Sequence, residues 1–208
     1  MKRKHPLWFL LPLAFLLSLA ACSSQEPDTA AQENTIAPYA LTDQEQSLLY
    51  AFGLTEEKAQ VFSFQAPAEA TAIFLQVSRL GEDGTWENTA DSVAGIAIGE
   101  DQEGPFSGLL GLEEESDRSI SLHLQTNLGN LATPPQGAAP DLAWTMRSSV
   151  FLEDPQTIQL DQPIPVALLA YDSGTSMSSL NLQDYFTPEN LTGPDLVQAV
   201  TVTFSSEV

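Results

Sequence analysis

After Glu57, hydrophobic and polar side chains alternate at every second residue over short stretches, the pattern of half-buried β-strands. Ile120, Leu122 and Leu124 show it most clearly, because the residues between them are polar. The expected strands cover residues 61–64, 73–77, 93–98, 120–124, 144–152, 164–171 and 200–204. Residues 106–112 are Gly-rich and their pattern is ambiguous. Asp83-Gly84 predicts a hairpin turn, because both residue types tolerate positive φ angles.

A short helix is expected before these strands. Thr42 and Glu45 have the spacing of a capping box, in which the hydroxyl caps an early amide and the carboxylate reaches back. Leu48, Leu49 and Phe52 then share one helical face, and Gly53 suits the end of the helix. A further helical turn is expected over residues 187–191.

Many short strands without alternating helices indicate an antiparallel all-β protein. We therefore predict a two-sheet sandwich, jelly-roll-like or immunoglobulin-like, with a short N-terminal helix. The Cys–Trp–Cys arrangement of true immunoglobulin domains is absent. Residues 164–171 are apolar on both faces and belong inside a sheet, with Pro163 and Pro165 near the start of the strand. Trp144, Met146, Val150 and Leu152 are expected on one side of their strand.

The first 21 residues have the organisation of an export signal. Lys2, Arg3 and Lys4 precede an apolar run over 7–19, which is shorter than the roughly 20 residues of a membrane-spanning helix. Leu19-Ala20-Ala21-Cys22 then resembles the lipobox of bacterial lipoproteins. This resemblance implies cleavage before Cys22 and attachment of a diacylglycerol to its sulfur. The chain is thus expected to be exported and anchored on the extracytoplasmic face of the cell membrane.

The region from Cys22 to Pro38 is expected to be a lipidated cysteine followed by a flexible linker. It is rich in Ser, Ala, Gln, Glu and Pro, and Ile36 is its only bulky apolar residue. Such a segment buries too little apolar area to offset the entropy of ordering. Residues 39–208 then form a single β-domain.

The composition supports a folded domain and limits the classes of partner that it can bind. The 208 residues are 43% hydrophobic, which suffices for a core. After Cys22, four basic residues stand against 28 acidic ones, a formal charge of −24. This balance argues against nucleic acid as a partner, because phosphates require a basic surface. It also predicts repulsion from anionic lipid, which would hold the domain off the membrane. The single cysteine excludes a disulfide within the chain.

The C-terminal third carries a second resemblance. Residues 159–166, Asp184-Tyr185-Phe186 and residues 200–204 look like the corresponding part of surface lipoproteins from gut Firmicutes. The resemblance implies a cell-surface β-domain and assigns no active residue.

Catalytic chemistry has few candidates in this sequence. After Cys22 the only histidine is His123, on the polar side of its strand, and no Gly-x-Ser-x-Gly motif accompanies it. Zinc sites need several His or Cys ligands, and no cofactor motif is present. Calcium has weak candidates in two acidic runs, although neither has EF-hand spacing. These candidates are Glu100, Asp101, Glu103, Glu113, Glu115 and Asp117.

Aromatic side chains near strand ends are the remaining ligand candidates. Trp86 lies just past the expected hairpin, and Tyr171 and Tyr185 lie near strand ends, where exposed rings could stack on sugars. Trp144 alternates with apolar neighbours and is expected in the core.

These observations predict a membrane-anchored lipoprotein that acts as a non-enzymatic binding or adhesion module, with the membrane and a glycan or an envelope protein as partners. One alternative is an accessory subunit that docks another envelope protein, by strand addition or through its acidic surface. The other is a glycoside hydrolase based on paired carboxylates, which a pocket holding two such groups would favour.

Overall fold

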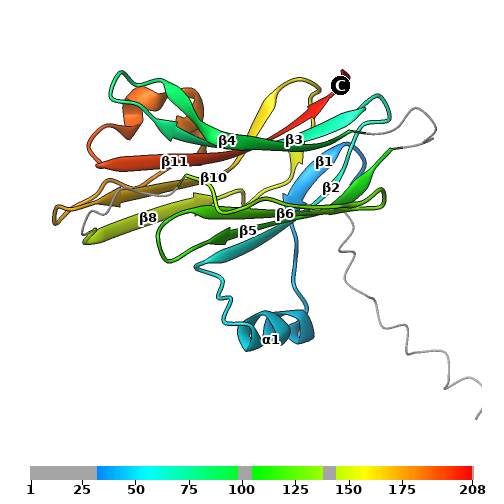
Figure 1. Cartoon of the computed structure of the whole chain (residues 1–208), viewed down its shortest axis with the longest axis horizontal. Helices are drawn as coiled ribbons and strands as arrows, with labels where there is room; N and C mark the ends of the chain where they lie inside the picture. The colour runs from blue at the N-terminus through cyan, green and yellow to red at the C-terminus, as the bar shows by residue number, and fades with distance from the viewer. Residues whose placement is uncertain (1–31, 98–104, 138–143, 208) are drawn as a thin grey trace, which may run out of the picture.

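The computed structural model describes residues 32–97, 105–137 and 144–207. These residues form two antiparallel sheets and one α-helix (Figure 1). The first sheet has the order β7-β6-β5-β2-β1-β9, with β1 (Thr35–Pro38), β2 (Ala59–Gln65), β5 (Ser107–Glu114), β6 (Ile120–Thr126), β7 (Asn130–Ala132) and β9 (Gln156–Thr157). The second has the order β4-β3-β11-β10-β8, with β3 (Ala72–Leu80), β4 (Trp86–Ala97), β8 (Met146–Phe151), β10 (Pro163–Asp172) and β11 (Leu196–Ser205). The all-β prediction is confirmed, and the arrangement is consistent with a β-sandwich.

The main hydrophobic core lies between the two sheets. Phe62 and Phe64 of β2 contribute from the first sheet, and Leu75 and Val202 from the second, all with 2% exposure or less. Strands β2, β3 and β6 supply every second side chain to this core, as the alternating sequence pattern predicts. β10 lies between β11 and β8 and is buried on both faces, so its predicted place inside a sheet is confirmed.

A second, smaller core covers the outer face of the second sheet. Two 3-10 helices, η1 (Leu182–Phe186) and η2 (Pro188–Leu191), interrupt the connection between β10 and β11. Leu191 and Tyr185 from this insertion pack against Leu168 and Val197 on the sheet. Figure 1 shows the insertion beside β11 and β4. The predicted turn at 187–191 is therefore η2, whereas η1 has no counterpart among the predictions.

The linker expected to extend to Pro38 ends earlier in the structure. Thr35–Pro38 form β1, which pairs with β2 on one side and β9 on the other. Ile36 is fully buried in the main core. The prediction was wrong for these four residues, because a single apolar side chain gives no periodic signal even when two neighbouring strands enclose it.

The single face predicted for residues 144–152 was also wrong. Val150 packs in the second core, whereas Trp144 and Leu152 contact the main core. Trp144 precedes β8 and Leu152 follows it, so the alternation of the strand does not extend to either residue. The expected core position of Trp144 is confirmed in part, since the residue is half-buried and its ring packs against the main core 5.9 Å from that of Tyr171.

The strands at the predicted hairpin are longer than expected. β4 begins at Trp86 and includes the run predicted at 93–98 as far as Ala97. Between β3 and β4, Gly84 has a φ of 78°, and the Asp83 carboxylate accepts hydrogen bonds from the amide and hydroxyl of Thr85. The turn prediction is confirmed, with Gly84 rather than Asp83 in the left-handed region.

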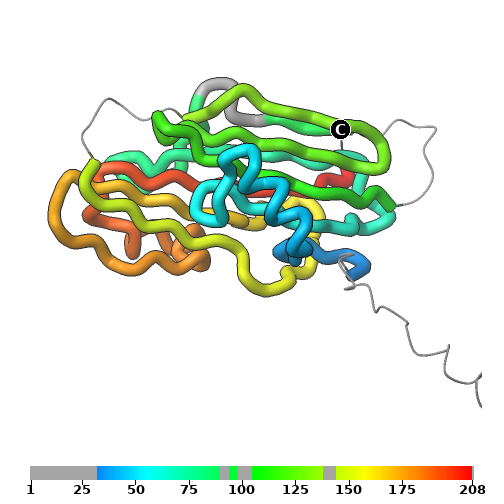
Figure 2. Tube along the Cα trace, turned by 90° about the horizontal axis from the view of Figure 1, so that it is seen from below, coloured from blue at the N-terminus to red at the C-terminus, as the bar shows by residue number. Residues whose placement is uncertain are grey.

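Helix α1 (Asp43–Ala51) forms where the capping box predicts it. The Glu45 amide donates to the Thr42 hydroxyl, and the Thr42 amide donates to Glu45 at 2.8 Å. The helix buries none of its residues, and Leu48, Tyr50 and Phe52 are 51–75% exposed. It lies outside the first sheet in the cartoon and in the tube view (Figures 1 and 2). The exposed apolar side chains of the helix therefore face solvent rather than the hydrophobic core. No helix among the described residues is long and apolar enough to cross a bilayer.

Two glycines of β5 provide a test of strand packing. A Cβ atom at Gly108 would overlap the carbonyl oxygen of Gln125 on β6, whereas one at Gly111 would lie 3.6 Å from its nearest neighbour, the Cβ of His123. Gly108→Ala is expected to lower the free energy of unfolding by about 1–3 kcal/mol, because backbone has to move. Gly111→Ala is expected to stay within about 0.5 kcal/mol. Urea unfolding of both variants measures this, and equal losses would contradict the β5–β6 geometry.

Candidate functional site

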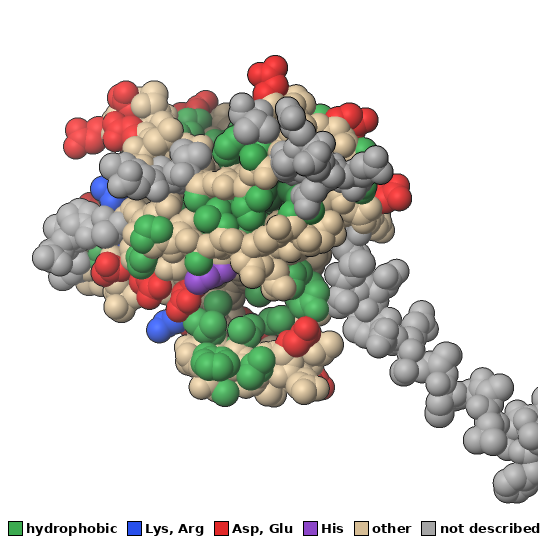
Figure 3. Space-filling model, turned by 45° about the vertical axis from the view of Figure 1, so that its right-hand side comes forward, with side chains coloured by type: hydrophobic (Ala, Val, Ile, Leu, Met, Phe, Trp, Pro, Cys, Tyr) green, Lys and Arg blue, Asp and Glu red, His purple; other side chains and the backbone are tan. Residues whose placement is uncertain are grey.

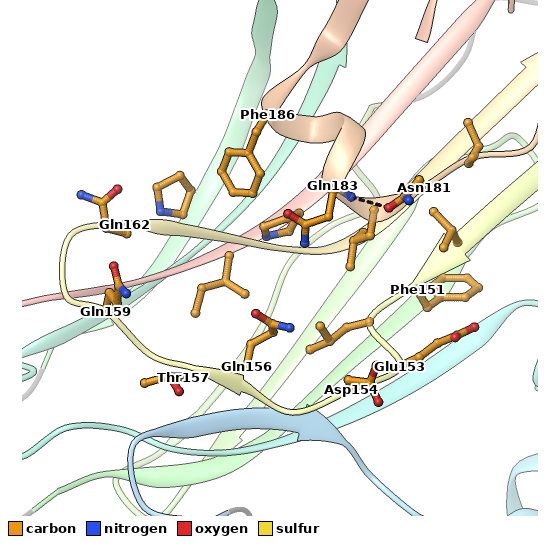
Figure 4. A pocket seen from close by; sticks show the side chains of 17 residues that line it. Phe151, Glu153, Asp154, Gln156, Thr157, Gln159, Gln162, Asn181, Gln183 and Phe186 are labelled. Carbon is orange, nitrogen blue, oxygen red and sulfur yellow. Dashed lines mark hydrogen bonds between the residues drawn. The ribbon is translucent and has the colours of Figure 1, made fainter. Parts of the chain in front are cut away.

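A groove of about 630 Å³ opens where the edge strands β8 and β9 of the two sheets meet the η1 insertion. We call it the η1 groove. Its walls are the β8–β9 loop, the β9–β10 loop and η1 (Figure 4). This volume lies within the range of pockets that bind small ligands.

The two loops of the groove are fixed to the sheets. In the β8–β9 loop, the Leu152 amide donates to the carbonyl of Val166 at 2.9 Å. In the β9–β10 loop, Asp161 has a φ of 61°, and its carboxylate accepts hydrogen bonds from the hydroxyls of Ser205 and Ser206. These bonds hold the pKa of Asp161 below its usual range. The loop is thereby tied to the end of β11.

The third wall presents an aromatic ring. Phe186 is 58% exposed and extends from η1 toward the groove (Figure 4). Its ring meets that of Tyr185 edge-to-face at 5.1 Å, and Tyr185 stacks on Trp86 at 5.2 Å. The indole NH of Trp86 donates to the backbone carbonyl of Tyr185 at 2.9 Å. The Asn181 side chain caps the start of η1. Phe186 is consequently exposed but held in place.

The polar lining is dominated by side-chain amides. Gln156, Gln159, Gln162 and Gln183 come from separate stretches of the chain and line one groove. None of these four side chains forms a hydrogen bond with another residue in the part of the chain that the structure describes. Their donors and acceptors are therefore available to a ligand or to water.

The carboxylates of the groove all lie on one wall. Glu153 and Asp154 are consecutive residues of the β8–β9 loop, and no other Asp, Glu, Lys or Arg is among the lining residues. Glycoside hydrolysis uses two carboxylates that flank the scissile bond, an arrangement that one loop does not provide here.

The three aromatic residues predicted as ligand contacts have different environments. Trp86 and Tyr185 stack on each other and anchor η1, and both are half-buried. Tyr171 has no exposed surface and cannot stack on a ligand, which contradicts its predicted role. Phe186, the exposed ring beside Tyr185, was missed, because Asp184-Tyr185-Phe186 carries no pattern that separates inward from outward rings.

Tyr171 instead belongs to a buried ionic cluster between the sheets. Glu114 of β5, whose side chain is 2% exposed, pairs with Arg118 at 3.0 Å and with Arg147 of β8. The Arg118 guanidinium also lies 5.4 Å from the centre of the Tyr171 ring. Burial and the nearby Glu114 carboxylate raise the pKa of Tyr171, an effect that Arg147 and Arg118 partly offset. Two of the four basic residues after Cys22, Arg118 and Arg147, thus form ion pairs within the domain.

This environment predicts a loss of stability in alkaline solution. In the unfolded chain Tyr171 releases its proton near pH 10, whereas the folded state retains it because its pKa is raised. The free energy of unfolding should therefore fall as the pH rises above about 10. Tyr171→Phe should remove this part of the fall, and Tyr50→Phe, at an exposed position on α1, should not. Urea midpoints between about pH 8 and pH 11 measure it. An identical alkaline fall in wild type and Tyr171→Phe would contradict the prediction.

The calcium candidates that the structure describes, Glu113, Glu115 and Asp117, are not brought together into a metal site. The described residues contain no group of three or more acidic, His or Cys side chains that could hold a metal. Glu115 accepts a hydrogen bond from the Ser121 hydroxyl, and Asp117 accepts from the amide and hydroxyl of Ser119. These bonds from Ser119 lower the pKa of Asp117. Glu113 is part of β5, whereas Glu100, Asp101 and Glu103 lie outside the described residues.

His123 and Cys22 are the remaining residues that the sequence analysis considered. His123 is exposed on β6, and its side chain makes no hydrogen bond with another described residue. Cys22 lies outside the described residues, so its lipidation stays a prediction.

No protein-family model, no curated protein and no solved structure matches the chain significantly. Function is therefore inferred from the groove and its side chains.

Proposed function

We propose that this protein is a lipid-anchored binding module on the extracytoplasmic face of the cell membrane, and that the η1 groove holds its ligand without chemical conversion. The observation that carries this proposal is a groove of about 630 Å³ lined by amides that form no hydrogen bonds with other described residues. The lipobox at Cys22 supports the anchor, and the strand arrangement supports the predicted β-sandwich. Its jelly-roll-like or immunoglobulin-like type stays a prediction.

The lining supports binding over catalysis. A nucleophile requires an adjacent base, and His123 does not line the groove. The two lining carboxylates, Glu153 and Asp154, share one loop rather than facing each other across a bound substrate. Hydrolysis by paired carboxylates is therefore less well supported than binding.

A fragment screen tests the proposal directly. The full chain in detergent is screened by ligand-observed NMR against neutral, anionic and cationic fragments. We expect neutral polar fragments to bind, to lose binding in Gln156→Trp, which obstructs part of the groove, and to remain chemically unchanged. Gln125→Trp, at an exposed position on β6, is the matched control. Hits that survive Gln156→Trp, or fragments that are converted, would contradict the proposal.

The exposed face of α1 favours a second function, docking of another envelope protein. Leu48 and Phe52, four residues apart, expose apolar side chains on one side of α1, and Tyr50 is exposed on another side. Figure 3 shows hydrophobic side chains gathered over the α1 end of the molecule. The helix has Asp43 and Glu45 in its first turn and no basic residue. This combination fits a protein groove with an apolar floor and a basic rim, and it disfavours anionic lipid. Photo-crosslinking in cells from position 52 should yield a defined adduct that position 125 does not give. Equal labelling from both positions would argue against docking.

A further inference from the structure

We propose that the ligand of the η1 groove is a short stretch of uncharged saccharide, which stacks on Phe186 and is hydrogen-bonded by the surrounding amides. This inference rests on the proposed function and specifies its ligand class. It places the stacking ring at Phe186 of η1 rather than at the buried Tyr171.

The charges of the lining disfavour anionic ligands. No Lys or Arg lines the groove, and Glu153 and Asp154 repel phosphates, sulfates and uronates. Gln156, Gln162 and Gln183 each offer a carbonyl oxygen and an NH₂ group. A hydroxyl donates and accepts in the same way, so neighbouring hydroxyls on a sugar ring match these amides. A purely apolar ligand would leave the amides without partners.

Phe186 supplies the apolar surface that a sugar ring requires. The CH face of a pyranose packs against the electron-rich face of an aromatic ring. Tyr185 and Trp86 already hold Phe186 in place, so binding costs little side-chain entropy. Figure 4 shows the Phe186 ring and the Gln183 amide at η1, with Gln162 and Gln156 on the facing loop segments. A ligand between these walls would contact ring and amides together.

The backbone of the groove disfavours a peptide. Strand addition needs a row of free NH and CO groups at a sheet edge. Pro163 and Pro165 have no NH, and the amides of Leu152 and Ile158 already donate to Val166 and Asn34. These residues shorten the row of free backbone groups, whereas the glutamine side chains of the groove make no hydrogen bonds with other described residues, which suits hydroxyls better than a peptide backbone.

The test measures binding of the full chain in detergent to defined oligosaccharides. One panel contains neutral oligomers of glucose, mannose, galactose and N-acetylglucosamine, a second contains uronate and sulfated oligomers, and a third contains neutral peptides. We expect binding only in the neutral saccharide panel. Phe186→Ala should weaken it by about tenfold or more and Gln183→Ala by about fivefold. The controls are Gln44→Ala on α1 and Gln125→Ala on β6, at exposed positions outside the groove, which should bind as wild type does.

Three results would overturn the saccharide assignment. If a neutral peptide binds and Phe186→Ala abolishes that binding, the groove is a binding site and only its ligand class is wrong. If a saccharide binds equally well to wild type and Phe186→Ala, the binding site lies elsewhere. If no member of any panel binds, the saccharide assignment fails, and the fragment screen decides separately whether the groove binds ligands.

Discussion

Replacing Glu114 with glutamine is expected to lower the free energy of unfolding by about 1.5–3 kcal/mol. The side chain of Glu114 is 2% exposed and pairs with Arg118 and Arg147, so the neutral amide leaves two guanidinium groups without their counterion. Both arginines lose charge-assisted hydrogen bonds, but their side chains are 34% and 26% exposed, so water offsets part of the cost of leaving them unpaired. Urea unfolding near pH 7 measures the loss.

Glu113→Gln is the matched control for this prediction. Glu113 is the preceding residue of the same strand, and its side chain makes no ion pair with another described residue. We expect its effect to stay within about 0.5 kcal/mol. Because the Glu114 carboxylate is buried while its arginine partners are partly exposed, high salt should reduce the difference between the two variants without removing it. A similar effect of both substitutions would show that the ionic cluster does not stabilise the fold.

Replacing Phe204 with alanine is expected to cost about 3–5 kcal/mol of unfolding free energy. Phe204 of β11 is fully buried, and its ring lies 5.3 Å from Phe64 and 5.9 Å from Phe106. These three rings join the two sheets, so the truncation leaves a cavity between layers that are held by paired strands on both sides.

The control for Phe204 is another phenylalanine at the surface. Phe52 is 75% exposed after α1, and Phe52→Ala should change the free energy of unfolding by no more than about 0.5 kcal/mol. Thermal or urea unfolding of both variants makes the comparison. A loss below about 1 kcal/mol for Phe204→Ala would mean that the sheets do not pack through this aromatic cluster.

The η1 groove shows which part of the site was predictable from the sequence. Tyr185 was identified as a residue near a strand end, and its neighbour Phe186 was not, although the two differ mainly in exposure. The sequence separates Gln156 from Gln183 by a complete strand and a loop. They line the same groove because the chain crosses from the first sheet at β9 to the second sheet at β10. No local sequence pattern encodes that crossing.

Features that depend on neighbours in the sequence were determined by the sequence itself. The capping box at Thr42 and Glu45, the turn at Gly84 and the alternation of β6 all follow from backbone geometry over a few residues. Only the tertiary structure decided that Ile36 is core, that Tyr171 faces Glu114 and that Phe186 is exposed. Burial depends on which strand lies opposite a side chain, and that strand is distant in the sequence.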